Sequence, residues 1–395
     1  MKGALLLIGL FALSMLMIPL MLAGGPAGEP QAPGAPLATF SPEASPSEEA
    51  LPGPAAEAPA ETPQGPPGKP VELLSGEDAP PEPFSPEGAL TPEAEAAPAE
   101  DSPLIEGVSE FVILDETTGE LNRVPLRDYI RGAVAAEMPA RFHPEALKAQ
   151  AVAAHTYALR QHYTQLENPD PALMGADFSA DPENRLVYMT EEKAREFYGE
   201  AADEYWNKIC EAADGVAGQV LVYDNEPIVA AYHAISAGVT EDASNVWTGE
   251  APYLKPAVSE GDLLAPDYET ELTFTAQALK TALLNEYPDL ELAKDPGEWV
   301  GEATRSYSDY VAEIKIGGKA IAGTDIRRIL GLRSHSFEIT ESEGIFTFTV
   351  YGHGHGVGLS QYGADFMARQ GRAYGEILEN YYAGASLYSV SGPDL

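Results

Sequence analysis

The sequence predicts an α+β protein in which mixed antiparallel strands and helices form one elongated head with a substrate cleft. Three observations support this prediction: helical apolar spacing in residues 124–159, alternating apolar runs beside glycine turns, and a disorder-type composition before residue 104. We divide the 395 residues into a transmembrane helix at 1–23, a disordered linker at 24–103 and a folded head at 104–395.

Residues 4–23 form an apolar run of about the length that spans a bilayer. A secretory h-region is usually shorter, roughly 7–15 residues, so we expect an uncleaved signal anchor, with cleavage near Ala23-Gly24 as the alternative. Lys2 is the only positive charge that closely flanks the run, and positive charge stays inside. We therefore expect a single-pass protein of the cell membrane with an extracytoplasmic head.

Residues 24–103 are rich in Pro, Ala, Glu, Gly and Ser, and Lys69 is their only cation. Such a segment buries too little apolar surface to fold, and acidic Pro-rich chains extend. We expect a tether that holds the head away from the membrane, although a disordered segment without function has the same composition. The net charge of −39 argues against binding of nucleic acid and against direct docking on anionic lipid.

Cys210 is the only cysteine in the sequence. An intrachain disulfide and a cysteine-based zinc site are therefore excluded. A lipoprotein anchor is excluded too, because no cysteine directly follows the apolar run. We expect Cys210 to be a small buried hydrophobe.

The head begins with a predicted hairpin, residues 110–114 and 120–124, and continues as two helices. Pro125 suits the first turn of the first helix, and Met138-Pro139 ends that helix because proline cannot extend it. Pro144 starts the second helix. Small and apolar residues recur along both helices at helical spacing: Leu126, Ile130, Ala133 and Val134, then Leu147, Ala151, Ala154 and Ala158.

Glu137 lies on the apolar side of the first helix, in its last turn. Burial and the negative end of the helix dipole both disfavour the charged carboxylate, so we expect its pKa to exceed the usual value of about 4.3. A carboxylic acid that stays protonated near neutral pH is suited to general acid catalysis of glycoside cleavage. The alternative is that Glu137 pairs with Arg141 or Lys148 and only stabilises the turn.

The remaining elements follow from helical or alternating apolar spacing and from glycine or proline punctuation. In chain order we predict a loop at 168–184, a helix at 191–213, a hairpin at 219–234 around Asp224-Asn225, a helix at 275–285, a strand at 309–316, a helix at 323–330 capped by Thr324, strands at 337–339 and 345–350, and a closing helix at 365–382.

The segment after the 219–234 hairpin carries His233, Ser236 and Thr240, and then Trp247 and Tyr253. Hydroxyl groups and aromatic faces next to a glycine suit a polysaccharide cleft, because aromatic rings stack on sugars. A turn with two buried aromatic residues is the alternative.

Residues 351–364, YGHGHGVGLSQYGA, contain five glycines, which require unusual backbone angles or close approach of other groups. In an extended segment, His353 and His355 would point to the same side. Metal binding and a rigid polar wall of a cleft are both consistent with this pattern. A phosphate loop is not, because the run lacks the terminal Lys-Ser/Thr.

Taken together, these stretches resemble the stage II sporulation protein D family, which also includes the amidase enhancer. The motifs that carry the resemblance are AAEMPARFHPEALKAQAVAAHTYAL, YHAISAGVTEDASNVW with PYL, IRRILGLRSHSFEI, and GHGHGVGLSQYGA with EILENYYAGASL. They occur in the family's order and span residues 124–387.

The resemblance implies a lytic transglycosylase that cleaves peptidoglycan between N-acetylmuramic acid and N-acetylglucosamine without water, leaving an anhydromuramic end, with no cofactor. It places the catalytic role on Glu137, which would serve as acid and then as base. It also implies a set of substrate-binding residues: Lys148, Gln150, His155, His233, Ser236, Thr240, His355, Ser360 and Gln361. A surface charge is the alternative for Lys148.

The chain departs from the family pattern at two positions. His155 stands where the family usually has arginine, and a histidine replaces an arginine charge only when it is protonated. Ala237 replaces the first residue of a more usual glycine pair. Some members hold zinc near this motif with cysteines that are absent here, so we predict no metal.

The family further implies a role in spore engulfment beside a peptidoglycan amidase of the stage II sporulation protein P type and a membrane scaffold protein. The main alternative is a non-catalytic, membrane-tethered activator of an amidase, in which Glu137 is structural. A His-Gly-His metallohydrolase is a third interpretation, and the sequence disfavours it because no acidic ligand is patterned with the histidines.

Overall fold

The computed structural model describes residues 105–390 of the chain. The transmembrane helix and the linker predicted for residues 1–103 lie outside these residues. None of the helices within the described range combines the length and the apolar character needed to cross a membrane.

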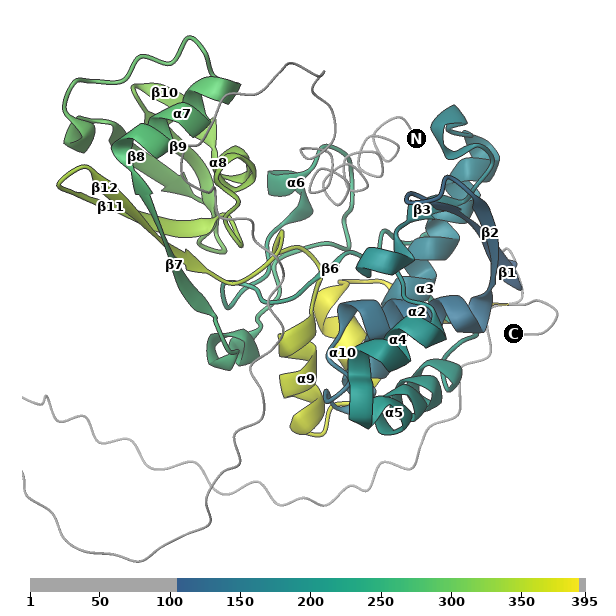
Figure 1. The fold of residues 1–395 in the computed structure, drawn as a ribbon. Coiled ribbons are helices and arrows are strands. Elements are labelled where there is room, and N and C mark those ends of the chain that lie inside the picture. Colours follow the sequence, from purple (N-terminus) through teal and green to yellow (C-terminus); the bar gives the residue numbers. More distant parts are fainter. Residues whose placement is uncertain (1–104, 391–395) are drawn as a thin grey trace, which may run out of the picture. The chain divides into compact units, whose positions relative to one another are not determined.

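Helices and strands alternate irregularly along the chain, which confirms the predicted α+β class (Figure 1). The α-helices are α2 (Leu126–Glu137), α3 (Pro144–Glu167), α4 (Glu191–Tyr198), α5 (Ala202–Asp214), α6 (Ala243–Val246), α7 (Ala276–Glu286), α8 (Gly323–Leu330), α9 (Gln361–Arg369) and α10 (Tyr374–Tyr381).

The strands of the described residues form small sheets, and most of their pairings are antiparallel. In sheet order they are β2 (Leu121–Pro125), β1 (Glu110–Asp115) and β3 (Phe178–Ala180); β14 (Ser386–Ser389), β4 (Gln219–Tyr223) and β5 (Glu226–Pro227); β13 (Leu359–Ser360) and β6 (Tyr232–His233); β10 (Lys319–Ala322), β9 (Val311–Ile316) and β8 (Val300–Arg305); and β11 (Ser336–Ser342), β12 (Ile345–Tyr351) and β7 (Glu269–Thr275). The pairs β1–β3 and β6–β13 are parallel.

The larger hydrophobic core surrounds α3, the longest of the described helices. This helix contacts α2, α5, α9, α10 and strand β4. Six of its thirteen buried residues are alanines, which leave room for these neighbours to approach from several sides.

A second core lies between the two three-stranded antiparallel sheets that contain β7–β12, together with α7 and α8. Phe346 and Phe348 of β12 are fully buried there, and Trp299 stacks on Phe346 at a ring-centroid distance of 5.4 Å. Figure 1 shows these elements grouped together in green, with the later strands in yellow-green.

Four predicted elements differ in detail from the structure. The helix expected at 191–213 breaks at Gly199, whose φ is +56°, and the closing helix at 365–382 divides into α9 and α10 around Gly371, whose φ is +92°. Thr324 lies inside α8 rather than capping it, and Pro125 precedes α2 as its N-cap. The prediction has no counterpart for strands β3, β7, β8, β10, β13 and β14, and β3 lies within the loop expected at 168–184.

Candidate active site

Glu137 is the last residue of α2, and the chain turns sharply immediately after it. Met138 is extended, with φ −123° and ψ 135°, as expected for a residue that precedes proline. Pro144 occupies the first turn of α3, and the His143 side chain caps that helix by accepting a hydrogen bond from the Glu145 N–H. The sequence therefore places a carboxyl at a fixed break between two helices.

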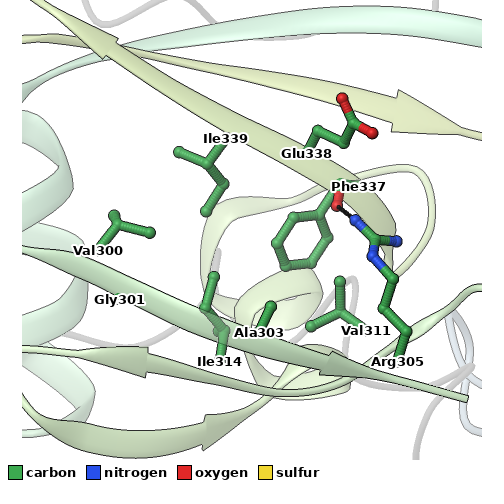
Figure 2. Close-up of a pocket in the computed structure, with 9 residues that line it drawn as sticks. All are labelled: Val300, Gly301, Ala303, Arg305, Val311, Ile314, Phe337, Glu338 and Ile339. Carbon is green, nitrogen blue, oxygen red and sulfur yellow. Dashed lines mark hydrogen bonds between the residues drawn. The ribbon is translucent and has the colours of Figure 1, made fainter.

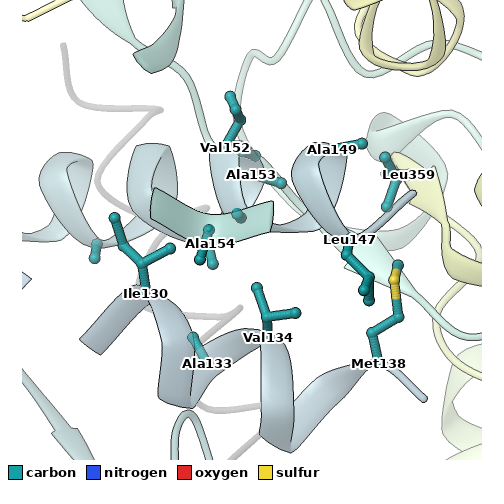
Figure 3. Close-up of a cluster of buried hydrophobic side chains, with 14 of the residues drawn as sticks. Ile130, Ala133, Val134, Met138, Leu147, Ala149, Val152, Ala153, Ala154 and Leu359 are labelled. Atoms are coloured by element: carbon teal, nitrogen blue, oxygen red, sulfur yellow. The ribbon is translucent and has the colours of Figure 1, made fainter. Parts of the chain in front are cut away.

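Small residues allow α2 and α3 to pack closely on the side that Figure 3 shows. Ile130, Ala133 and Val134 of α2 are buried, and Met138 extends toward Leu147 and the β13 residue Leu359 in the same view. On another side of α2, Gly132 allows close backbone contact, because a Cβ there would lie 2.1 Å from the carbonyl oxygen of Met189. These contacts hold the last turn of α2, and with it Glu137, in place.

The Glu137 side chain is partly buried and keeps some access to solvent. Burial raises the pKa of its carboxyl to about 7, and the positive charge of Arg185 opposes that rise. At neutral pH the protonated and ionised forms of Glu137 are therefore both populated, which confirms the expected direction of the pKa shift.

Two phenol groups, those of Tyr129 and Tyr232, interact electrostatically with this carboxyl. The charge of Glu137 raises the pKa of Tyr129 and Tyr232, and burial is the larger cause in both cases. Burial also raises the pKa of Tyr157, which interacts electrostatically with both tyrosines. All three phenols stay protonated at neutral pH and can donate hydrogen bonds.

The structural alternative for Glu137, an ion pair with Arg141 or Lys148, is not observed. Lys148 Nζ pairs instead with Glu145 Oε1 at 2.7 Å, one turn earlier on α3. Within residues 105–390, Glu137 forms no ion pair.

The segment after the glycine–histidine run packs against the turn that follows Glu137. The rings of Phe142 and Tyr362 lie 4.9 Å apart, edge to face. The backbone N–H of His143 donates to Asp365 Oδ1 at 2.6 Å, and Gln361 Nε2 donates to Gln150 Oε1 at 3.4 Å. The structure thus brings together two motifs that lie far apart in the sequence.

Several residues that the resemblance assigns to substrate binding are completely buried. Ser236 and Ser360 both donate to the carboxylate of Asp262, at 2.5 Å and 2.7 Å, and Asp262 has no exposed surface. Burial raises the pKa of Asp262. Thr240 accepts a hydrogen bond from the Ala257 N–H at 2.9 Å. These hydroxyl groups have structural partners, and substrate contact stays a prediction for them.

His233 and His355 lie side by side, with ring centroids 5.6 Å apart, and the Trp247 ring is 4.8 Å from that of His355. His233 Nδ1 lies 3.1 Å from the Val357 carbonyl oxygen, and the Val357 N–H donates to His355 Nδ1 at 3.1 Å. Burial lowers the pKa of both rings, that of His233 to about 3, so both histidines are neutral at pH 7.

His155 has no exposed surface, and its Nδ1 lies 3.1 Å from the backbone oxygen of Gln219 at the start of β4. Burial lowers the pKa of this histidine to about 4, so it is neutral at pH 7. The neighbouring Thr156 hydroxyl accepts from the Leu221 N–H at 2.9 Å. Both side chains therefore connect α3 to β4, and His155 carries no charge that would replace an arginine.

The premise that residues 352–358 are extended is wrong. Each glycine of this run has a positive φ, between +73° and +114°, so the backbone bends at every second residue. His353 is exposed, whereas His355 is partly buried beside Trp247. Within the range that the structure describes, no group of three or more His, Cys, Asp or Glu side chains is placed to hold a metal ion.

Comparison with known proteins identifies this architecture. A family model described as "Stage II sporulation protein" matches residues 115–223. Stage II sporulation protein D of Bacillus amyloliquefaciens is 37% identical over 268 residues, which cover 68% of this chain and 75% of the relative. The protein of the same name in Bacillus subtilis is 37% identical over 270 residues, with the same coverage. The chain belongs to the stage II sporulation protein D family.

A more distant relative of this stage II sporulation protein D family member is the amidase enhancer of Bacillus subtilis. It is 27% identical over 319 residues, which cover 66% of this chain and 40% of the relative. The resemblance drawn from the sequence motifs is therefore confirmed at the level of the family.

Sequence reasoning missed four residues at the site of this family member: Arg185, Tyr129, Tyr232 and Asp262. Arg185 has a φ of +61°, and its guanidinium lies 4.0 Å from the centroid of the Phe197 ring. It lies just after the loop expected at 168–184, in a stretch for which no element was predicted. Tyr129 lies two turns before Glu137 on α2, so helical spacing could have found it. Asp262 carries no local pattern that marks it as buried.

The structure also contains a pocket of about 270 Å³ that is lined by none of the predicted site residues. As Figure 2 shows, Val300, Val311, Ile314 and Phe337 surround it, and Arg305 donates from its rim to the Phe337 carbonyl oxygen at 2.7 Å. The pocket lies between β8 and β11, and none of its lining residues belongs to α2.

Proposed function

We propose that this protein is a peptidoglycan lytic transglycosylase that uses Glu137 as its single acid and base. The carrying observation is the carboxyl at the end of α2, whose pKa burial raises to about 7 in a residue that is only partly buried as a whole. A group with this pKa gives up or takes a proton readily at neutral pH, and solvent access leaves room for substrate.

The reaction needs one carboxyl rather than the two of most glycosidases. Protonated Glu137 donates its proton to the glycosidic oxygen, and the bond from that oxygen to C1 of N-acetylmuramic acid breaks. The C6 hydroxyl of the same sugar attacks C1, and its proton returns to the Glu137 carboxylate. The products are a free 4-hydroxyl on N-acetylglucosamine and a 1,6-anhydromuramic end, with no water consumed.

The neutral phenols near Glu137 fit this scheme. Tyr232, whose pKa the Glu137 charge and burial both raise, keeps its proton and would donate a hydrogen bond to substrate. Other predicted residues would contribute indirectly. The amide contact of 3.4 Å between Gln150 and Gln361 would hold α3 and α9 together, and the Lys148–Glu145 pair would stabilise the start of α3.

The cellular setting follows from the family and from the N-terminal sequence. We propose that residues 1–23 anchor the chain in the cell membrane and that the head acts on the extracytoplasmic wall during spore engulfment. Its partners would be a peptidoglycan amidase of the stage II sporulation protein P type and a membrane scaffold protein.

A second candidate function is activation of a peptidoglycan amidase without catalysis. The observation that favours it is the 27% identity to a protein named amidase enhancer. The two functions are compatible, and they differ in whether Glu137 is needed.

The deciding experiment is digestion of peptide-free glycan strands by the purified full chain, with mass spectrometry of the products. The wild type is expected to release fragments with anhydromuramic ends, each one water lighter than a hydrolysis product. Glu137→Gln preserves the shape of the side chain but cannot donate a proton, and is expected to release none.

Asp128→Asn is the matched control, because Asp128 is an exposed carboxylate in the first turn of the same helix. It should cleave strands at the wild-type rate. Intact strands with the wild type, combined with faster turnover of an added amidase by both wild type and Glu137→Gln, would instead establish the activator function.

A further inference from the structure

Hydrogen bonds of Arg333 connect α8 to the glycine–histidine run. The Arg333 carbonyl oxygen accepts from Arg327 Nε at 3.3 Å and from the Gly354 N–H at 2.9 Å. Arg333 Nη2 also lies 3.2 Å from His353 Nδ1. These contacts join α8, the loop after it and the run at 352–358 into one cluster, which we call the arginine cluster.

Histidines of β6, of the loop after α8 and of the run at 352–358 lie around Arg327. The charge of Arg327 lowers the pKa of His233, His335, His353 and His355, although desolvation is the larger cause for each ring. Tyr310 packs on His335 at a ring-centroid distance of 4.5 Å. An ionised Tyr310 phenolate would raise the pKa of Arg327. All of these neighbours are neutral at pH 7, so the guanidinium charge is not compensated by them.

Arg327 is partly exposed, and burial lowers the pKa of its guanidinium. In the part of the chain that the structure describes, neither Arg327 nor Arg333 forms an ion pair with a carboxylate. This is unexpected in a chain with 62 acidic and 23 basic residues. The next residue behaves oppositely, because Arg328 Nη2 pairs with Glu286 at 2.7 Å and with Asp325 at 3.0 Å.

Two buried ring nitrogens in the same cluster also lack a protein partner. Within residues 105–390, His233 Nε2 and His335 Nδ1 make no hydrogen bond, and both side chains are at least 96% buried. A cluster of buried polar groups around an uncompensated arginine is costly unless something binds there.

We propose that Arg327 and Arg333, with His353 at the rim, form a binding site for a small carboxylate. A guanidinium presents a planar fork of N–H donors that matches the two oxygens of a carboxylate. Among residues 105–390, one donor of Arg327 is occupied, by the Arg333 carbonyl oxygen. The chemistry excludes a metal cation, because two unpaired positive charges would repel it.

The natural ligand follows from the proposed function, whereas the anion site itself does not depend on it. Peptidoglycan carries a carboxylate on the lactyl group of each muramic acid and on its stem peptides. N-Acetylmuramic acid is therefore the appropriate probe, and N-acetylglucosamine, which lacks the lactyl carboxylate, is its matched control.

The test is calorimetric titration of the purified full chain with each sugar. We expect N-acetylmuramic acid to bind at millimolar concentration or tighter, and N-acetylglucosamine at least tenfold more weakly. Arg327→Met should weaken binding of N-acetylmuramic acid at least tenfold, and Arg327→Lys should fall between the two because it keeps the charge but loses the fork. Arg328→Met, at the ion-paired neighbour, should bind as the wild type does.

Circular dichroism and thermal unfolding of each variant establish whether it is folded. If Arg327→Met is not folded, Arg333→Met takes its place, and we expect it to bind N-acetylmuramic acid at least threefold more weakly than the wild type. Equal binding of the two sugars, equal binding of inorganic phosphate, or unchanged binding by Arg327→Met or Arg333→Met would each overturn the proposal. The anion site is judged from binding of N-acetylmuramic acid and the proposed function from glycan cleavage by the wild type, so that failure of the one and failure of the other remain distinguishable.

Discussion

The positive charge of Arg185 acts on the Glu137 carboxyl and opposes the rise in pKa that burial gives it. Arg185 follows the short 3₁₀ helix Pro182–Asn184, in the left-handed backbone region, and its guanidinium lies over the Phe197 ring of α4. The two residues come from elements with no local sequence relation. The acidity of Glu137 is therefore set by the tertiary fold and can be tuned from outside its own helix.

The first prediction concerns the pH dependence of glycan cleavage. In the proposed mechanism Glu137 must be protonated to donate to the leaving oxygen, and burial raises its pKa to about 7. We therefore expect kcat/KM to fall tenfold per pH unit above about pH 7, and to be nearly constant over the unit or so below it. Initial rates on peptide-free glycan strands between pH 5 and 9 would measure this. A profile that stays flat up to pH 9 would contradict the assigned role.

The second prediction follows from the Arg185 charge. Arg185→Met removes a cation that lowers the pKa of Glu137, so the falling limb of the same profile should move to higher pH. Arg195→Met is the control, because Arg195 is a partly exposed arginine of α4 that pairs with Glu191 at 2.6 Å. The control profile should match the wild type, and an unmoved limb in Arg185→Met would show that Arg185 does not act on the catalytic group.

The third prediction concerns stability. The folded protein binds the Glu137 proton more tightly than the unfolded chain, because the pKa rises from 4.5 to about 7. The stability associated with the protonated carboxyl is fully present below pH 4.5 and is lost as the pH rises through 7. At pH 8 the buried, ionised Glu137 therefore lowers the free energy of unfolding of the wild type by roughly 3 kcal/mol. Glu137→Gln removes that cost.

Urea unfolding at two pH values measures the effect. Glu137→Gln should be more stable than the wild type at pH 8, by about 1–3 kcal/mol, and close to it at pH 4. Asp128→Asn, at the exposed end of the same helix, should show no such difference between the two pH values. A Glu137→Gln variant that is less stable at pH 8 would mean that the ionised carboxylate has a stabilising partner.

Local sequence patterns predicted the part of the site that is built from neighbours in the chain. Pro139 and Pro144 fix the break between α2 and α3, and the apolar spacing of α2 places Glu137 on its inner side. The hairpin at Asp224-Asn225 was also predictable, because both residues adopt the positive φ that this turn requires. These features depend on backbone rules that act within a few residues.

The environment of the site could not be derived in this way. Arg185 reaches Glu137 through tertiary packing, and Asp262 gathers Ser236 and Ser360 from two other segments. The hydroxyl and imidazole groups that suggested a cleft are largely buried, because polar residues beside glycines serve buried hydrogen bonds as readily as they serve ligands. The helices predicted at 191–213 and 365–382 are each divided in the structure, because the apolar spacing continues across the glycine that breaks each helix.

The last prediction separates the structural role of His155 from the substrate contact that the family implies. His155 is buried and neutral, and its Nδ1 lies 3.1 Å from the Gln219 oxygen. His155→Ala leaves that oxygen unpaired and opens a cavity, so it should lower the free energy of unfolding by about 2–4 kcal/mol. His155→Asn places an amide N–H near the position of Nδ1 and should lose less than half as much.

Urea unfolding measures both free energies of unfolding. Glycan cleavage by folded His155→Asn should stay within about threefold of the wild type, because a group with no exposed surface does not touch substrate. If His155→Asn instead unfolds like the wild type but cleaves more than tenfold more slowly, then His155 reaches the substrate and the structural assignment is wrong.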